Sequence, residues 1–161
     1  MKKLLTFAAV AIAAMLFVAP TAFAAEFIAP DEDSGNITLS NGETHKNVYI
    51  AGGSIFINSN IAGDLYGAGG NIIVEGNVEQ DVVIAGGNIT INGQVGGDVR
   101  VAGGNVTING AVGGDVLVGG GTLHLTEKAN VNGDLFAGAG ETTVDATVVG
   151  NVKIAGGKVT L

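Results

Sequence analysis

The residues of this sequence with the clearest capacity for chemistry are aspartates that recur at a fixed spacing. Five aspartates and two asparagines, here called the aspartate column, occupy one position of a repeat: Asn47, Asp64, Asp81, Asp98, Asp115, Asp134 and Asn151. In stacked strands, equivalent carboxylates lie about 4.8 Å apart and repel one another unless a partner offsets their charge. Carboxylate oxygens are also ligands that Ca²⁺ prefers. A row of calcium sites is therefore one interpretation of the column.

A purely structural role is the alternative, and the sequence favours it. Asp and Asn side chains commonly accept hydrogen bonds from backbone N–H groups, so each member of the column is expected to cap its own turn. Asn47 and Asn151 suit this role, because asparagine keeps the accepting oxygen and loses the charge. The calcium-binding nonapeptide G-G-x-G-x-D-x-U-x also has a different period. We therefore expect no resident metal ion and no other cofactor.

The aspartate column marks a repeat of 17 residues, which we number from position 1 at the column. One spacing is 19, because two residues are added near Glu127 and Lys128. The consensus is D-V-x-V-A-G-G-N-V-T-V-N-G-x-V-G-G, with apolar residues at positions 2, 4, 9, 11 and 15. Apolar residues spaced two apart, most of them β-branched, are typical of short strands with one buried face. We predict strands at positions 1–5, 8–12 and 14–16.

This repeat also predicts the fold class. We expect an all-β protein, a single-stranded parallel β-helix or β-solenoid, with about seven coils over residues 47–161 and a triangular cross-section. One coil cannot bury its apolar face alone, so stacked neighbours must supply the core. The preference of parallel connections favours a right-handed coil.

Glycine fills position 7 in every coil, and we call these residues the corner glycines. They are Gly53, Gly70, Gly87, Gly104, Gly121, Gly140 and Gly157. Such strictness predicts either a backbone with φ > 0 or a site without room for a Cβ atom, two conditions that glycine meets at low cost.

Residues 1–24 are expected to be a signal peptide. Lys2 and Lys3 precede an apolar stretch at residues 4–20, and an A-x-A site ends at Ala24, with the cut before Ala25. An uncleaved membrane anchor is the alternative, since about 20 apolar residues span a bilayer. In both cases the remaining chain is expected to be exported to the periplasm, the cell surface or the extracellular space.

The exported part divides into two segments. Residues 25–35 are expected to be an acidic lead or cap, and residues 36–161 the β-helix repeat domain. Residues 36–39 (NITL) match positions 8–11 and predict a partial first coil. The last coil ends at Leu161, position 11, without a polar cap. Either this end stacks on another molecule, or the sequence belongs to a longer protein.

Composition argues against several classes of function. Without Lys2 and Lys3, five Lys or Arg stand against fifteen Asp or Glu, a net charge of −10. A nucleic-acid partner is not expected, because phosphate binding needs clustered basic residues. The chain has no cysteine, which excludes a disulfide framework and an acylated lipoprotein cysteine.

Large apolar residues fall at position 3 of several coils, where side chains are expected to point outward. We call this row the outward stripe: Tyr49, Tyr66, Val83, Leu117 and Phe136. Contact with another filament or with a membrane or cell-wall surface is one interpretation. A scatter of ordinary surface hydrophobes is the other.

Catalysis is not expected. Neither of the two histidines, His45 and His124, pairs with a plausible Ser or Cys nucleophile. Sugar cleavage would need acidic residues gathered in one groove, whereas the aspartate column repeats uniformly. We therefore predict a non-enzymatic protein with no small-molecule substrate.

Four segments share the pattern V-x-G-D-[IV] or a close variant: residues 61–65 (IAGDL), 95–99 (VGGDV), 112–116 (VGGDV) and 131–135 (VNGDL). On these segments the chain resembles the bactofilins, a family of polymer-forming bacterial cytoskeletal proteins. The resemblance implies a right-handed triangular β-helix that associates end to end into non-polar filaments, without nucleotide and often next to a membrane. Bactofilins are typically cytoplasmic, so the expected signal peptide departs from the family.

The sequence thus predicts a structural protein of the cell envelope that self-assembles end to end into filaments or scaffolds. The expected partner is a second copy of the chain, which meets the unpaired N–H and C=O groups of Val159, Thr160 and Leu161. The alternative is a surface-exposed binding or adhesion module, or a rigid spacer, stabilised by calcium.

Overall fold

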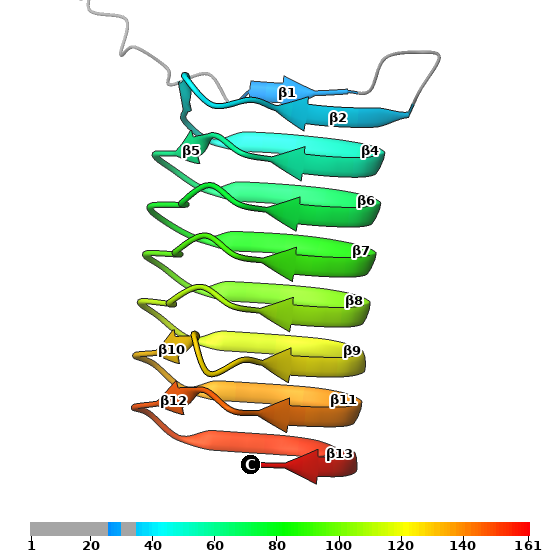
Figure 1. Cartoon of the computed structure of the whole chain (residues 1–161), viewed down its shortest axis with the longest axis vertical. Coiled ribbons are helices and arrows are strands. Elements are labelled where there is room, and N and C mark those ends of the chain that lie inside the picture. The colour runs from blue at the N-terminus through cyan, green and yellow to red at the C-terminus, as the bar shows by residue number, and fades with distance from the viewer. Residues whose placement is uncertain (1–25, 30–34) are drawn as a thin grey trace, which may run out of the picture.

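The chain folds as a parallel β-solenoid in the computed structural model, which describes residues 26–29 and 35–161. The described residues form strands and turns without a helix, and the solenoid makes about seven turns of about 17 residues. Figure 1 shows the coils stacked in chain order from the N-terminal to the C-terminal end. The predicted fold class is confirmed. No helix that could cross a membrane occurs in this part of the chain.

One long strand runs through two sides of each coil. These strands are β4 (Val48–Ile57), β6 (Leu65–Val74), β7 (Val82–Ile91), β8 (Val99–Ile108), β9 (Val116–Leu125), β11 (Leu135–Val144) and β13 (Val152–Thr160). Each pairs in parallel with the strand one coil away, and equivalent positions lie opposite one another, as Val82 does with Val99. The first two predicted strands of a coil are therefore one bent strand, because pairing continues through position 6 and resumes at position 8.

The third side of the coil is less regular. It holds the short strands β3 (Thr44–His45), β5 (Asn60–Ile61), β10 (Asn130–Val131) and β12 (Thr147–Val148), and single parallel bridges link Val78, Val95 and Val112. The predicted third strand is thus reduced to one or two residues per coil. Glycines flank it at positions 13 and 17 of several coils, so the chain turns on either side of position 15.

The first coil is divided between β1 (Glu26–Ile28) and β2 (Asn36–Leu39), which both pair with β4. β2 lies opposite positions 8–11 of the next coil, which confirms the predicted partial coil. β1 lies opposite positions 2–4, so the segment expected as an acidic lead contributes a strand to the solenoid. The predicted signal peptide and its cut between Ala24 and Ala25 lie outside the described residues.

The inward-facing positions form a continuous hydrophobic core. Columns at positions 2, 4, 9, 11 and 15 hold the predicted aliphatic residues, and Leu65, Ile91 and Val99 are completely covered. Exposed or half-buried side chains alternate with these buried ones along inner strands such as β8, as a single buried face requires. Two polar side chains, Ser59 and Thr142, are also buried, and their hydroxyl oxygens have no hydrogen-bond partner.

The corner glycines have no left-handed backbone. Among the described residues, the glycines with positive φ are Gly35 and Gly42, both before the first full coil. A Cβ atom on Gly87 or Gly121 would lie 2.8 or 2.7 Å from the carbonyl oxygen of the corner glycine in the preceding coil. Of the two predicted conditions, φ > 0 does not apply and lack of space does, since neighbouring coils pack backbone against backbone at this corner.

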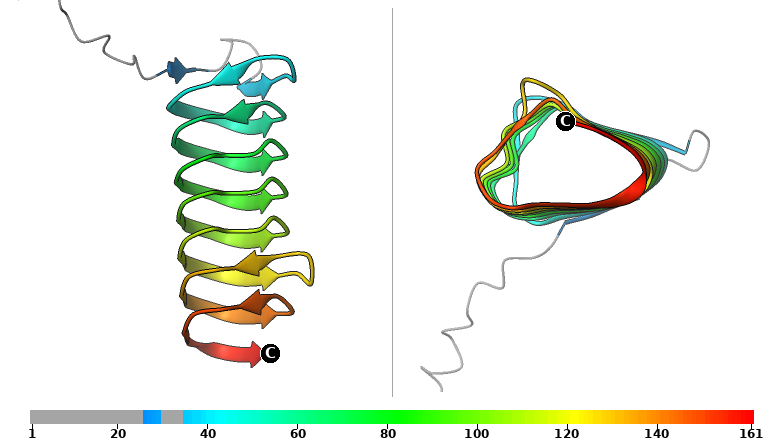
Figure 2. Two further views of the ribbon diagram at one scale, coloured as in Figure 1. Left: turned by 90° about the vertical axis from the view of Figure 1, so that its left-hand side faces the viewer. Right: turned by 90° about the horizontal axis from the view of Figure 1, so that it is seen from below.

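Seen along its axis, the solenoid is a closed ring with three unequal sides (Figure 2). The two added residues near Glu127 lengthen one loop, which stands out from the stack in Figure 2. The backbone N–H of Ala129 closes this loop on the carbonyl of Thr126 at 2.9 Å. Because the extra length is confined to the loop, Leu135 still pairs with Val116 and the register is kept.

Candidate functional site

The aspartate column connects each coil to the next. The Oδ1 atom of each member from Asn47 to Asp134 accepts a hydrogen bond from the backbone N–H of the next member, at 2.7–3.1 Å. The prediction that each side chain caps its own turn is therefore wrong. The side chains cap the following coil, because stacking in register places that N–H group within reach of the carboxylate.

The glycines at position 17 make room for these hydrogen bonds. A Cβ atom on Gly97 or Gly114 would lie 2.2 or 2.1 Å from the Oδ1 atom of Asp81 or Asp98, the column residue at position 1 of the same coil. The consensus has glycine at position 17 as well. The reason is contact along the stack, which the sequence of one coil does not display.

Arg100 offsets part of the negative charge in the column. Its guanidinium nitrogens lie 3.1 Å from Oδ2 of Asp81 and 2.6 Å from Oδ2 of Asp98. The hydrogen bond from the backbone N–H of Asp98, and then the contact with Arg100, hold the pKa of Asp81 below its usual value. Sequence reasoning missed Arg100, although its place two residues after Asp98 on an outward position was a usable signal. Among the described residues, no group of three or more His, Cys, Asp or Glu is placed to hold a metal ion.

The two histidines each contact a carboxylate. His45 Nδ1 lies 2.7 Å from Glu26 Oε2, and His124 Nε2 lies 2.9 Å from Asp145 Oδ2. The first contact lies within the first coil, and the second joins residues of neighbouring coils. Neither of these contacts involves a Ser or Cys hydroxyl or thiol, so the geometry supplies no argument for nucleophilic catalysis.

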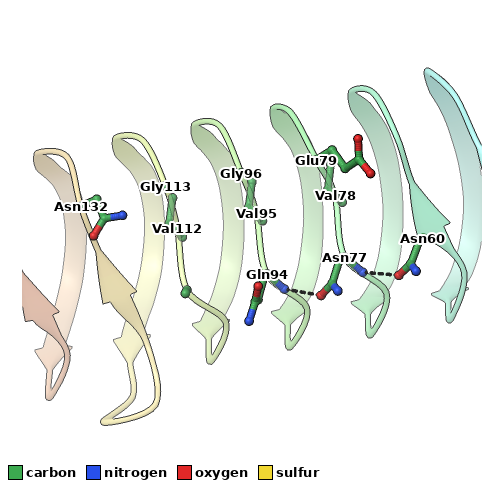
Figure 3. A pocket seen from close by; sticks show the side chains of 11 residues that line it. Asn60, Asn77, Val78, Glu79, Gln94, Val95, Gly96, Val112, Gly113 and Asn132 are labelled. Atoms are coloured by element: carbon green, nitrogen blue, oxygen red, sulfur yellow. Dashed lines mark hydrogen bonds between the residues drawn. The ribbon is translucent and has the colours of Figure 1, made fainter.

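A polar groove runs along the third side of the solenoid (Figure 3). Asn60 and Asn77 line it, and each accepts on Oδ1 the backbone N–H of the residue at position 14 of the following coil, at 3.0 and 2.9 Å. Glu79 and Asn132 stand along the other side of the groove, and the two coils between them have glycine at this position (Figure 3). The groove thus offers amide groups beside a stretch of bare backbone.

The outward stripe begins with an aromatic stack. The Phe27 ring of β1 stacks on Tyr49, and Tyr49 stacks on Tyr66, with ring centroids 4.9 and 4.7 Å apart. Phe27 was not among the predicted members, since the strand that positions it lies in the expected acidic lead. The register that pairs β1 with β4 places its ring directly over Tyr49.

Charged residues interrupt the rest of the outward stripe. Arg100 occupies position 3 beside Leu117, which is 51% exposed. Further along, Lys153 Nζ lies 5.3 Å from the ring centroid of Phe136. The predicted stripe lies on one face as expected, but it consists of separate apolar patches.

The last coil presents an uncovered edge. β13 pairs with β11, and no other described strand lies on its far side (Figure 1). The side chains of Val152, Val159 and Leu161 are 43, 44 and 81% exposed, although they belong to core columns. The predicted assembly edge at Val159, Thr160 and Leu161 therefore combines exposed aliphatic side chains with a free strand edge.

Comparison with known proteins adds no assignment. The chain matches no protein-family model, no curated protein and no solved structure. What stands established is the fold, a β-solenoid of about seven turns, and the arrangement of residues on its surface.

Proposed function

We propose that this protein is a non-enzymatic structural component of the cell envelope that self-associates end to end into filaments or scaffolds. The observation that carries the proposal is the edge of β13, the last strand of the described residues, where side chains of core columns face solvent. The resemblance of the repeat to that of the bactofilins supports it, because that family assembles into filaments. If the chain is exported as expected, the assembly would lie outside the cytoplasm.

The exposed core columns give association a driving force. Leu125 occupies in an inner coil the position that Leu161 occupies in the last, and it is completely buried. Fully covering a Val or Leu side chain contributes about 1.5–3 kcal/mol. A second copy pairing with β13 would also satisfy backbone N–H and C=O groups that the free edge leaves to water.

The regularity of the surface supports a structural role over an enzymatic one. The carboxylates of the aspartate column are used in hydrogen bonds between coils, and Arg100 is used in ion pairs with two of them. The apolar patches of the outward stripe are suited to lateral contact with a second assembly or with a membrane or cell-wall surface. No nucleic acid and no small-molecule substrate enters the proposal.

Negative-stain microscopy and sedimentation of the chain from Ala25 onward test the proposal. We expect end-to-end oligomers or filaments whose share rises with protein concentration. Val159→Asp places a charge on the uncovered core column and should abolish them, whereas Thr160→Asp on the adjacent outward position should weaken them far less. Single particles that stay monodisperse at high concentration would overturn the proposal.

A binding module carried on a rigid spacer is the second candidate, and the polar groove favours it. The amides of Asn77, Gln94 and Asn132 line this groove, and amides donate as well as accept hydrogen bonds. Thermal melting with Ca²⁺ and with a chelator tests the calcium-stabilised form of this candidate. A rise in Tm on adding Ca²⁺ that the chelator reverses would favour it, while equal melting curves would favour the capping role of the aspartates.

A further inference from the structure

The chain contains two tyrosines, and the fold places them side by side. Tyr49 and Tyr66 occupy position 3 of consecutive coils and are paired in the register of β4 and β6. Their ring centroids are 4.7 Å apart, and the ring planes are 9° from parallel. Because the backbone register fixes this spacing, the two rings stay together for as long as the two coils remain paired.

Composition makes this pair the preferred target of one-electron oxidants. After residue 25 the chain has no cysteine, tryptophan or methionine, since both methionines lie before it. Thiols and thioethers are the usual first sites of oxidative attack. Phe27 covers the far face of the Tyr49 ring, and both tyrosines are half-buried, so they face each other with part of their edges open to solvent.

A fixed proton acceptor lies beside the pair. Oδ2 of Asp64 is 3.5 Å from the Tyr66 hydroxyl, while Oδ1 of the same carboxylate accepts the backbone N–H of Asp81 at 3.1 Å. The negative charge of Asp64 raises the pKa of Tyr66, so its phenol stays protonated at neutral pH. Oxidation of Tyr66 must then release a proton, and Asp64 is placed to accept it.

We propose that Tyr49 and Tyr66 form a site of oxidative coupling, at which a dityrosine bond joins the first two full coils. A peroxidase-type oxidant removes one electron and one proton from each phenol. The two radicals form one carbon–carbon bond between ring carbons ortho to the hydroxyl groups, and the hydrogens on those carbons move to the phenol oxygens as the rings become aromatic again. One hydrogen peroxide takes up the two electrons and two protons and leaves as two waters.

The bond would be a covalent cross-link between two coils at a place where the core has fewer side chains. Position 4 of the second full coil is Gly67, whereas the coils on either side have Ile50 and Ile84 at this position. This coil therefore contributes one core side chain fewer than its neighbours. A bond between Tyr49 and Tyr66 would keep the two coils together even when their core contacts open.

Treatment of the purified chain with a peroxidase and hydrogen peroxide tests the proposal. We expect dityrosine fluorescence and the loss of two hydrogen atoms from the intact mass, in a product that migrates as a single chain. The reaction should be much faster in the folded chain than in the same chain unfolded in urea. Tyr49→Phe and Tyr66→Phe keep the ring stack, lack one phenol and should give no intrachain product.

Two rearranged variants separate geometry from composition, since each keeps two tyrosines. Tyr49→Phe/Val83→Tyr places the phenols on adjacent coils, because Tyr66 pairs with Val83, and it should couple. Tyr66→Phe/Val83→Tyr places them two coils apart and should not. The proposal is overturned if both variants couple equally, if the natural chain gives only interchain dimers, or if it gives no product where free tyrosine couples.

Discussion

Ile37 and Leu39 near the N-terminal end occupy the same coil positions, 9 and 11, as Val159 and Leu161 at the C-terminal end. The first two are only 7 and 8% exposed, whereas the last two are 44 and 81% exposed. Equal places in the repeat therefore do not give equal burial. Among the described residues, the core columns are covered at the N-terminal end and exposed in the last coil.

Polar residues at inward positions distinguish the N-terminal end. Glu26 lies opposite Val48 at position 2, and His45 lies opposite Ile61 at position 15, where the following coils are aliphatic. His45 Nδ1 and Glu26 Oε2 are 2.7 Å apart, so the two polar groups satisfy each other. A polar outer face is what the terminal repeat of a solenoid supplies to stop further stacking. The last coil has no such pair among its described residues, and it is the end at which the proposed self-association would take place.

The sharpest test of this comparison places the same charge in position 9 at each end. Ile37→Asp buries an unpaired carboxylate and should lower the free energy of unfolding by about 3 kcal/mol or more. Val159→Asp should lower it by about 1 kcal/mol or less in the monomer, because the side chain already faces water, while it abolishes association. Urea unfolding at low protein concentration measures both.

Thr38→Asp is the matched control, since Thr38 is exposed and lies beside Ile37 on the same strand. It should leave the free energy of unfolding nearly unchanged. If Ile37→Asp and Val159→Asp cost the monomer the same, the core columns are equally covered at the two ends and the comparison fails.

A second test compares the last coil with the middle of the solenoid at position 2. Val99 is completely buried, and Val152 is 43% exposed. Val99→Ala removes buried methyl groups and leaves a cavity, so we expect a loss of about 2 kcal/mol. Val152→Ala should cost less than about 1 kcal/mol in the monomer, as judged by chemical denaturation. If Val152→Ala costs as much stability as Val99→Ala at high protein concentration, where the copies associate, Val152 is buried between copies.

Much of the fold was predictable from the sequence, because each coil repeats the same pattern of apolar residues and glycines. The valines at positions 2 and 4 of the coil that contains Val99 and Val101 already indicate a strand with one buried face. β1 was not predictable in this way. Its three residues occur before the first full coil and have Glu26 at an inward position, so no period marks them as a strand.

The candidate site was predictable in its residues and less so in its contacts. The sequence showed the aspartate column as a row. Its hydrogen bonds follow the stack, as when the backbone N–H of Asp98 donates to Asp81, and only the register of the coils reveals such a pair. Only part of the aromatic stack at Tyr49 could be predicted, because Phe27 reaches it through the pairing of β1 with β4. Contacts between coils depend on axial packing, which the pattern within one coil does not encode.

A buried hydroxyl in the coil before the last one leads to a smaller prediction, a gain in stability where the earlier variants lose it. Thr142 is completely buried at position 9, where the neighbouring coils have Leu123 and Val159, and its Oγ1 atom has no partner. Thr142→Val replaces the hydroxyl with a methyl group of similar size and should raise the free energy of unfolding by about 1 kcal/mol. Thr143→Val, on the adjacent outward position, is the control and should change stability little. A loss of stability in Thr142→Val would mean that the hydroxyl has a partner.

The smallest predicted effect is on the pH dependence of stability. It concerns Asp81 in the middle of the aspartate column, whose two ends are uncharged asparagines. Asp81 has a lowered pKa, first because the backbone N–H of Asp98 donates to it and then because of Arg100. A carboxyl whose folded pKa is lowered stabilises the fold above its unfolded pKa, near 4, and loses that contribution as the pH falls through its folded pKa. Asp81→Asn keeps the accepting oxygen, as Asn47 and Asn151 do, and removes the titrating group. Urea midpoints measured between pH 6 and about pH 2 should therefore fall less steeply for the variant in the acid range, and parallel curves would show that Asp81 does not contribute to acid sensitivity.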